Sequence, residues 1–268
     1  IKAALAELGL GEGARIGVMI RNHPDVVAAI LTAVSVDGTM VSINHMLPED
    51  KLRADLERLD LPVVIGIDED FARPGLLDTL KAAGTAVIET QPVLKGARLR
   101  PGFEKITGAN IRREQPGVII EMLTSGTTGT PKRIPLQRDA FLQSFKSAMS
   151  YESNRNPDDA PRLRSGVQLL GGPMAHIGGL WHALSTILAG RKACIIEKFS
   201  VPVWRDAIVR HRPKVAGAVP TGLRMILDAN LPKEDLESLV ALRTGAQPLD
   251  PAITQEFLDR YDLPVLQN

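Results

Sequence analysis

The sequence lacks the features that mark several large classes of protein. Its single cysteine, Cys194, excludes an intramolecular disulfide and a cysteine-cluster metal site. No apolar run reaches the roughly 20 residues that are needed to span a bilayer. With a net charge of +1, the chain has no large excess of cations to displace counterions from nucleic acid. We therefore expect a soluble, cytoplasmic protein that has no membrane span and binds no nucleic acid.

The residues that are present predict an α/β protein. Of the 268 residues, 44% are hydrophobic and 24% are charged, as in ordinary globular domains. Short apolar runs alternate with stretches of helical periodicity along the chain. Such alternation is typical of crossover units around buried, mostly parallel sheets. The expected strands in the first half are 16–20, 40–43, 63–67 and 86–88, and the expected helices are 24–34, 48–59 and 76–83.

A second set of alternating elements follows the first. Its expected helices are 139–149, 178–188, 203–211, 221–228 and 251–260, and its expected strands are 167–170, 192–196, 215–219, 240–244 and 265–266. We therefore predict two layered α/β subdomains with mostly parallel sheets, over residues 1–115 and 116–268. The section 91–115 has weak periodicity with several prolines, glycines and basic residues, so we expect it to be a surface connection between the two.

A loop rich in serine, threonine and glycine follows the hydrophobic run 118–122. Residues 123–132 read Leu-Thr-Ser-Gly-Thr-Thr-Gly-Thr-Pro-Lys. The glycines can adopt positive φ and let backbone N–H groups converge on an anion, while hydroxyls and a lysine add donors and charge. The candidate phosphate ligands are Thr124, Ser125, Gly126, Thr127, Thr128, Gly129 and Lys132. The simpler alternative is a polar hairpin without a ligand, because the same residues form plain turns.

Two common catalytic loops do not match this segment. A Walker A loop needs its lysine to open a helix, whereas Pro131 precedes Lys132 and the strand-like residues 134–136 follow. Proline removes an N–H group and stiffens the chain. Ser125 also lacks the Gly-x-Ser-x-Gly context of a hydrolase nucleophile. An ordinary P-loop NTPase and an α/β-hydrolase are therefore poor interpretations.

The order of residues in the loop resembles that of the adenylate-forming, or AMP-binding, superfamily, in its acyl- and aryl-CoA synthetase branch. Further segments are similar to those of the family in the expected order: 13–16, 22–25, 173–180, 219–221 and 243–249. The resemblance covers nearly the whole chain. One departure is Arg133, because most members have glycine directly after the lysine; this puts the local strand packing in doubt more than the phosphate contact.

The resemblance implies roles for individual residues. Lys132 and His176 become candidate catalytic residues, and the turn Gly245, Ala246, Gln247 and Pro248 is expected to lie against the adenine. The acid pocket is expected to include Met174, His176, Ile177, Gly178 and Thr221. Simpler alternatives remain: an isolated histidine is more often structural, and the turn also has the composition of a plain helix start, with Asp250 as N-cap and Pro251 as first helical residue.

The function implied by the resemblance is that of an ATP-dependent carboxylic acid:CoA ligase, which forms an acyl-adenylate and then a thioester. ATP, Mg²⁺, coenzyme A and a small carboxylic acid are the expected ligands. Two alternatives stay open: a nucleotide-binding regulatory protein without catalysis, and an amino-acid adenylation domain. Residues 171–181 contain no aspartate to pair with an ammonium group, which favours an uncharged acid tail.

The resemblance also indicates segments that the chain does not contain. The family's Tyr-Gly-x-Thr-Glu motif is expected directly after a segment like 264–268, and a small C-terminal domain with a catalytic lysine further on. The sequence starts without methionine, on the helical pattern 1–8. We therefore expect the chain to be a fragment that is inactive by itself.

Overall fold

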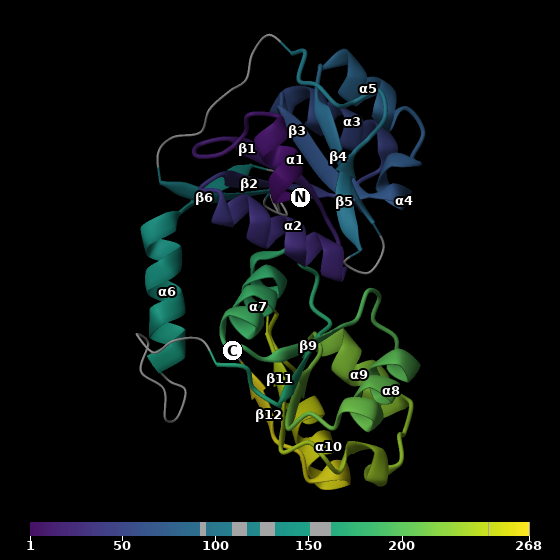
Figure 1. The fold of residues 1–268 in the computed structure, drawn as a ribbon. Helices are drawn as coiled ribbons and strands as arrows, with labels where there is room; N and C mark the ends of the chain where they lie inside the picture. The colour runs from purple at the N-terminus through teal and green to yellow at the C-terminus, as the bar shows by residue number, and fades with distance from the viewer. Residues whose placement is uncertain (92–94, 109–116, 124–131, 151–161, 246, 268) are drawn as a thin grey trace. The chain divides into compact units, whose positions relative to one another are not determined.

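The computed structural model describes residues 1–91, 95–108, 117–123, 132–150, 162–245 and 247–267. The chain divides into two compact units, unit 1 over Ile1–Pro157 and unit 2 over Asp158–Asn268. Each unit combines helices with a mostly parallel sheet (Figure 1). Within the described residues, no helix is both long enough and apolar enough to cross a bilayer.

Unit 1 is built around a seven-stranded sheet with the order β5-β4-β3-β1-β2-β6-β7. The five inner strands run parallel to one another, and β5 and β7 pair antiparallel at the two edges. The strands are β1 (Arg15–Ile20), β2 (Thr39–Asn44), β3 (Val63–Ile67), β4 (Ala86–Gln91), β5 (Gly96–Leu99), β6 (Val118–Leu123) and β7 (Arg133–Gln137). The helices are α1 (Lys2–Glu7), α2 (Pro24–Ser35), α3 (Glu49–Leu59), α4 (Asp68–Phe71), α5 (Leu76–Ala82) and α6 (Arg138–Ser150).

Most residues of the inner strands are apolar, in keeping with the helices that cover both faces of the sheet. β1 and β3 are buried at every position, as expected for parallel strands between two helical layers. The leucines of α3 and α5 pack with Met19 of β1 in one core cluster. Neighbouring residues of a strand point to opposite faces, so Ile16 and Met19 of β1 lie on opposite faces of the sheet. Ile16 lies beside α2, because its Cδ1 atom and the carbonyl oxygen of Ala33 in α2 are both close to Gly38. Helix α2 therefore packs on the face opposite to α3 and α5.

A buried ion pair ties β6 to β1 across β2. Nη2 of Arg15 donates to both carboxylate oxygens of Glu121, at 3.1 and 2.9 Å, and Nη1 donates to Leu59 O at 2.8 Å. Glu121 is 7% exposed and Arg15 is 5% exposed. A carboxylate that is shielded from water in this way depends on its cationic partners. The pair therefore fixes β6 against both β1 and the end of α3.

A second arginine extends this pair to the edge strand. Nη1 of Arg133 in β7 donates to Ser42 O of β2 at 3.0 Å, and Nη2 donates to Oδ2 of Asp55 in α3 at 2.6 Å. Its Nε lies 3.6 Å from Oε1 of Glu121. We call Arg15, Asp55, Glu121 and Arg133 the charge network. It links β1, β6 and β7 to α3.

Unit 2 contains two smaller parallel sheets. One has the order β10-β11-β12 and the other pairs β8 with β9. Its core packs around Trp204, Phe257 and Leu242, all almost fully buried. Its elements are β8 (Val167–Leu170), α7 (Ile177–Leu188), β9 (Lys192–Ile195), α8 (Val201–His211), β10 (Val215–Gly217), α9 (Pro220–Asp228), the 3₁₀ helix η1 (Lys233–Leu236), β11 (Ala241–Thr244), α10 (Pro251–Tyr261) and β12 (Val265–Gln267).

The expected fold class, α/β with mostly parallel sheets, is confirmed. The division of the chain differs from the expected boundary at 115/116, because β6 pairs with β2 and β7 pairs with β6. Both strands belong to unit 1, which extends to Pro157. The expected connection 91–115 also contains a short strand, β5, which pairs antiparallel with β4.

The charge network generates a prediction about stability. Glu121→Gln removes the carboxylate that Arg15 and Arg133 share, so we expect the free energy of unfolding to fall by about 2–3 kcal/mol. Urea denaturation followed by circular dichroism would measure the change.

The control is an ion pair in the same unit whose carboxylate is exposed to solvent. Arg138 lies 3.1 Å from Asp37, whose side chain is 67% exposed, and Asp37 has a positive φ of 56° that asparagine also tolerates. Asp37→Asn should cost no more than about 1 kcal/mol. Equal losses in the two variants would contradict the importance of the buried network.

Candidate functional site

The predicted phosphate loop connects two adjacent antiparallel strands of unit 1. Leu123 at the end of β6 pairs with Arg133 at the start of β7. Residues 124–131 lie outside the described part of the chain, so the predicted ligands Thr124 to Gly129 are not placed. Lys132 is described and is exposed directly before β7. The connection follows the carboxyl end of β6, which is parallel to β2, and this is the edge where open α/β sheets bind ligands.

Arg133 has a structural role at the start of β7 that was not predicted from the sequence. Its side chain is 13% exposed and bonds to β2 and α3, so it holds the start of β7 directly beside Lys132. The sequence carried one signal for this role. Glu121 is a lone acid in the apolar run 118–122, and a buried carboxylate needs a partner.

The predicted acid-binding segment of unit 2 lies between β8 and α7. His176 is the N-cap residue of α7, with φ −109° and ψ 149°, and its side chain makes no capping hydrogen bond. Its backbone N–H donates to Pro173 O at 3.0 Å. The side chain is exposed, Ile177 is 50% exposed, and Met174 is 1% exposed. His176, Ile177 and Gly178 are thus accessible at the start of the helix, while Met174 is an interior residue that supports the turn.

Gly179 allows this turn to fold back on its helix. A Cβ atom at Gly179 would lie 2.2 Å from Pro173 O and 2.8 Å from Gly172 O. Real Cβ atoms essentially never approach that closely, and the obstacle is backbone, which cannot rotate away. A Cβ atom at Gly178 would meet nothing within 4 Å. The close approach at Gly179 therefore fixes the position of the predicted acid-binding segment.

The predicted adenine-binding turn follows β11 of unit 2. Gln247 O accepts a hydrogen bond from Nε2 of Gln267 at 3.4 Å, while Ala246 lies outside the described residues. Asp250 caps α10 by accepting from Ala252 N at 2.9 Å, with Pro251 as its first residue. The helix-start interpretation of this turn is thus confirmed, and it is compatible with a ligand beside it.

The carboxyl ends of the parallel strands β10 and β11 bring other predicted residues to the same edge. Thr221 is exposed in the first turn of α9, after β10. Gly245 follows β11 and is half-buried. Thr244 is 4% exposed, and its Oγ1 has no hydrogen-bond partner among the described residues. A buried hydroxyl without a partner is uncommon, and it fits a polar ligand at this edge. Thr244 was not among the predicted site residues.

His182 lies on the same helix as His176. Burial lowers the pKa of His182 below its ordinary value of 6.5, and the nearby positive charge of Arg243 in β11 lowers the pKa further. The imidazole is therefore neutral near pH 7. Its half-buried position is that of a structural residue.

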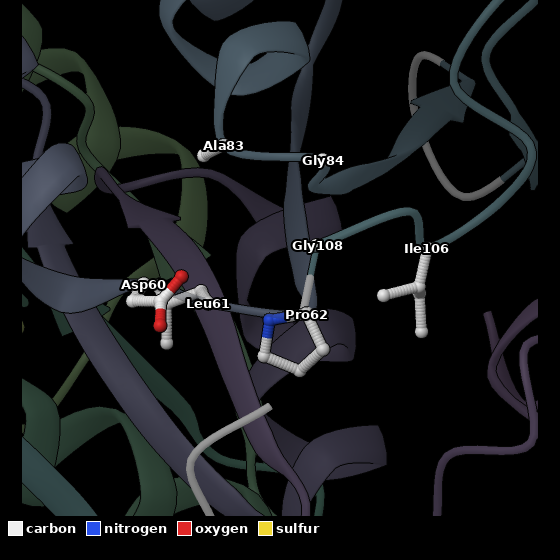
Figure 2. A pocket seen from close by; sticks show the side chains of 7 residues that line it. All are labelled: Asp60, Leu61, Pro62, Ala83, Gly84, Ile106 and Gly108. Carbon is white, nitrogen blue, oxygen red and sulfur yellow. The ribbon is translucent and has the colours of Figure 1, made fainter. Parts of the chain in front are cut away.

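A small pocket lies elsewhere, at the amino ends of β3 and β4 (Figure 2). Thr107 N and Gly108 N donate to Gly84 O there, at 2.9 and 3.3 Å. Its lining residues are Asp60, Leu61, Pro62, Ala83, Gly84, Ile106 and Gly108. Only one of these side chains is charged, and none was predicted to bind a ligand. The pocket is therefore a packing feature. It lies at the amino ends of its strands, whereas the phosphate-loop connection follows the carboxyl end of β6.

The described residues do not form a metal site of their own. No three histidine, cysteine, aspartate or glutamate side chains gather closely enough within those ranges to hold an ion. The described part of the chain therefore provides no protein cage for the expected Mg²⁺.

The chain matches a protein-family model and is similar to curated proteins. The family model described as "AMP-binding enzyme" matches residues 2–268. A 2-succinylbenzoate–CoA ligase of Bacillus pumilus is 26% identical over 264 residues, covering 98% of this chain and 50% of that protein. A long-chain-fatty-acid–CoA ligase of Bacillus subtilis is 21% identical over 282 residues, covering 93% of this chain and 49% of that protein. The chain thus spans about half the length of the curated relatives that it matches.

Solved structures show the same fold. Apo MatB from Rhodopseudomonas palustris has a TM-score of 0.76 at 19% identity, covering 99% of this chain and 51% of that one. The O-succinylbenzoate coenzyme A synthetase MenE from Bacillus subtilis, in complex with AMP, has a TM-score of 0.72 at 20% identity, covering 98% of this chain and 62% of that one.

The contact at Gly179 generates a prediction with a matched control. Gly179→Ala should lower the free energy of unfolding by about 2 kcal/mol or more, because the new methyl group collides with backbone. Gly178→Ala should leave stability equal or slightly raised, because alanine favours a helix and the site is open. Thermal unfolding of both variants would measure this, and equal melting temperatures would show that the turn is not fixed by Gly179.

The pKa of His182 generates a prediction about pH. The folded-state pKa is lowered, so the unfolded chain takes up the proton first as the pH falls. This contribution to stability is present above the unfolded pKa and is lost as the pH falls through the folded pKa. The urea midpoint should therefore fall between about pH 7 and pH 5, and His182→Gln should reduce this slope. The pKa of His45 is lowered by burial as well, so part of the slope should remain. An unchanged slope in His182→Gln would contradict the prediction.

Proposed function

The chain belongs to the family of AMP-binding enzymes, and on that premise we propose that it is part of an ATP-dependent carboxylic acid:CoA ligase. The observation that carries the proposal is the connection from β6 to Lys132, at the carboxyl edge of a parallel sheet, in a chain whose relatives are named as CoA ligases. In the proposed reaction, a carboxylate oxygen of the acid attacks the α-phosphorus of ATP. The bond to the bridging oxygen breaks and pyrophosphate leaves. The sulfur of coenzyme A then attacks the acyl carbon, loses its proton and displaces AMP.

The described residues supply parts of this chemistry. Lys132 would bind the β- and γ-phosphates and offset the charge that develops as pyrophosphate departs. Within unit 2, the hydroxyl of Thr244 and the turn after it offer polar groups at the carboxyl edge of a parallel sheet, where a ligand can bind. Mg²⁺ would be held mainly through phosphate oxygens, since it usually binds through one or two carboxylates and the substrate's phosphates.

The segment around His176 supports an acid with an uncharged tail. His176 and Ile177 are accessible at the start of α7, and residues 171–181 contain no carboxylate that could pair with an ammonium group. A buried charge without a partner is costly. We therefore propose that His176 lines the acid pocket and that fatty or aromatic acids are better substrates than amino acids.

Acid-dependent ATP–pyrophosphate exchange tests the proposal. The full product of the gene should catalyse exchange with fatty acids or benzoates. Lys132→Ala should lower the exchange rate by about a hundredfold, because a charge that meets the departing pyrophosphate is lost. Lys192→Ala, which changes an exposed lysine of β9, should leave the rate unchanged.

Other outcomes would separate the alternatives. Exchange with amino acids only would replace the proposal with amino-acid adenylation. ATP binding without exchange for any acid would leave a nucleotide-binding protein that does no chemistry.

A further inference from the structure

The strands on both sides of the predicted phosphate loop are held by one set of buried charges. Glu121 lies two residues before the end of β6, and Arg133 is the first residue of β7. Arg15 binds Glu121, while Asp55 binds Arg133 at 2.6 Å. The two ends of the connection are therefore fixed by the same network, and Lys132 is the residue next to it.

The guanidinium of Arg133 is engaged inside unit 1. It bonds to Ser42 O at 3.0 Å and to Asp55 at 2.6 Å, and its Nε lies 3.6 Å from Glu121. Only 13% of the side chain is exposed. A planar guanidinium binds a carbonyl and a carboxylate through separate nitrogens in a fixed geometry, whereas an ammonium group is a compact point charge without that rigid fork. Arg133 thus acts as a structural anchor, and its charge is already matched by Asp55 and Glu121.

This anchor restricts the backbone that carries Lys132. Lys132 directly precedes Arg133 in the chain, so an arginine that is held at β2 and α3 fixes the backbone from which the lysine side chain extends. A strand at the edge of a sheet has hydrogen bonds on one side only, and among the described strands β7 pairs with β6 alone. The side-chain bonds of Arg133 to β2 and α3 replace the support that a second neighbouring strand would give.

We propose that Arg133 is a positioning residue for Lys132: through Asp55 and Ser42 it sets where the lysine meets the phosphates of a bound nucleotide. The inference rests on the nucleotide-binding part of the proposed function. Arg133 itself does not touch the nucleotide. A substitution of Arg133 therefore displaces Lys132, and the nucleotide loses no direct contact with Arg133.

The test is a double-mutant cycle in the full product of the gene, with MgATP binding measured by calorimetry. Arg133→Gln should weaken MgATP binding by about tenfold, because a small displacement of a phosphate ligand is costly. In a Lys132→Ala background, the same change should weaken binding by less than about twofold, because the residue it positions is already gone.

Two further variants protect the test against simple unfolding. Arg133→Lys keeps the charge but cannot bridge Ser42 O and Asp55 together, so it should give an intermediate loss. Asp55→Asn changes the anchor from α3, far from Lys132 in sequence, and should weaken binding in the same direction. The matched control is Arg138→Gln, which removes an arginine five residues along the chain from an exposed pair with Asp37; it should leave MgATP binding unchanged.

The outcomes distinguish this inference from the proposed function. Additive losses for Arg133→Gln and Lys132→Ala would overturn the positioning role, and so would a lowered melting temperature with unchanged MgATP binding. If the wild-type protein binds MgATP with the expected coupling but shows no acid-dependent exchange, the ligase proposal fails and the positioning role stands. A wild-type protein that does not bind MgATP would overturn both.

Discussion

The candidate site depends on the buried pairing of carboxylates with arginines, on the side of the unit 1 sheet that contains β1, β2, β6 and β7. Apolar packing alone would hold β1 and β3, because helices cover both of their faces. The strands that lead into and out of the predicted phosphate loop lie further out, and within the described part of the sheet β7 has a neighbour on one side only. Glu121 and Arg133 supply the missing connection to β1, β2 and α3. Removing a charge from water is costly, so each partner strongly specifies the position of the other.

Parallel strands explain why residues far apart in the sequence are collected at common edges. The carboxyl ends of parallel strands lie on the same side of a sheet, and the segments that follow them are exposed there. In unit 2 this rule gathers Thr221, Thr244 and the turn with Gln247. In unit 1 it places the connection before Lys132 at the corresponding edge. The pocket beside Gly84, by contrast, lies at the amino ends of its strands.

The sequence predicts the parallel strands well because runs such as 63–67 contain no polar residue and can be stable only when buried on both faces. It does not show which sheet a strand joins, since the residues that pair β6 with β2 are 80 positions apart in the chain. The compact units therefore divide at 157/158 and not at the expected 115/116. The short strand β5 was not predicted, because none of its four residues is buried and its sequence has no clear alternation of apolar and polar residues. The bond between Arg133 and Asp55 could not be predicted either, because charged pairs so distant in sequence leave no local pattern.

Strand β7 also has a consequence for association between molecules. An exposed edge strand can recruit a foreign strand and begin aggregation. Pro135 lies in the middle of β7 and has no N–H group to donate to an incoming chain. At the opposite edge of the described sheet, β5 has only four residues and is followed by Arg100. Both edges are thus poor templates for intermolecular pairing, so the protein can present an accessible strand end beside Lys132 without inviting fibril-like growth.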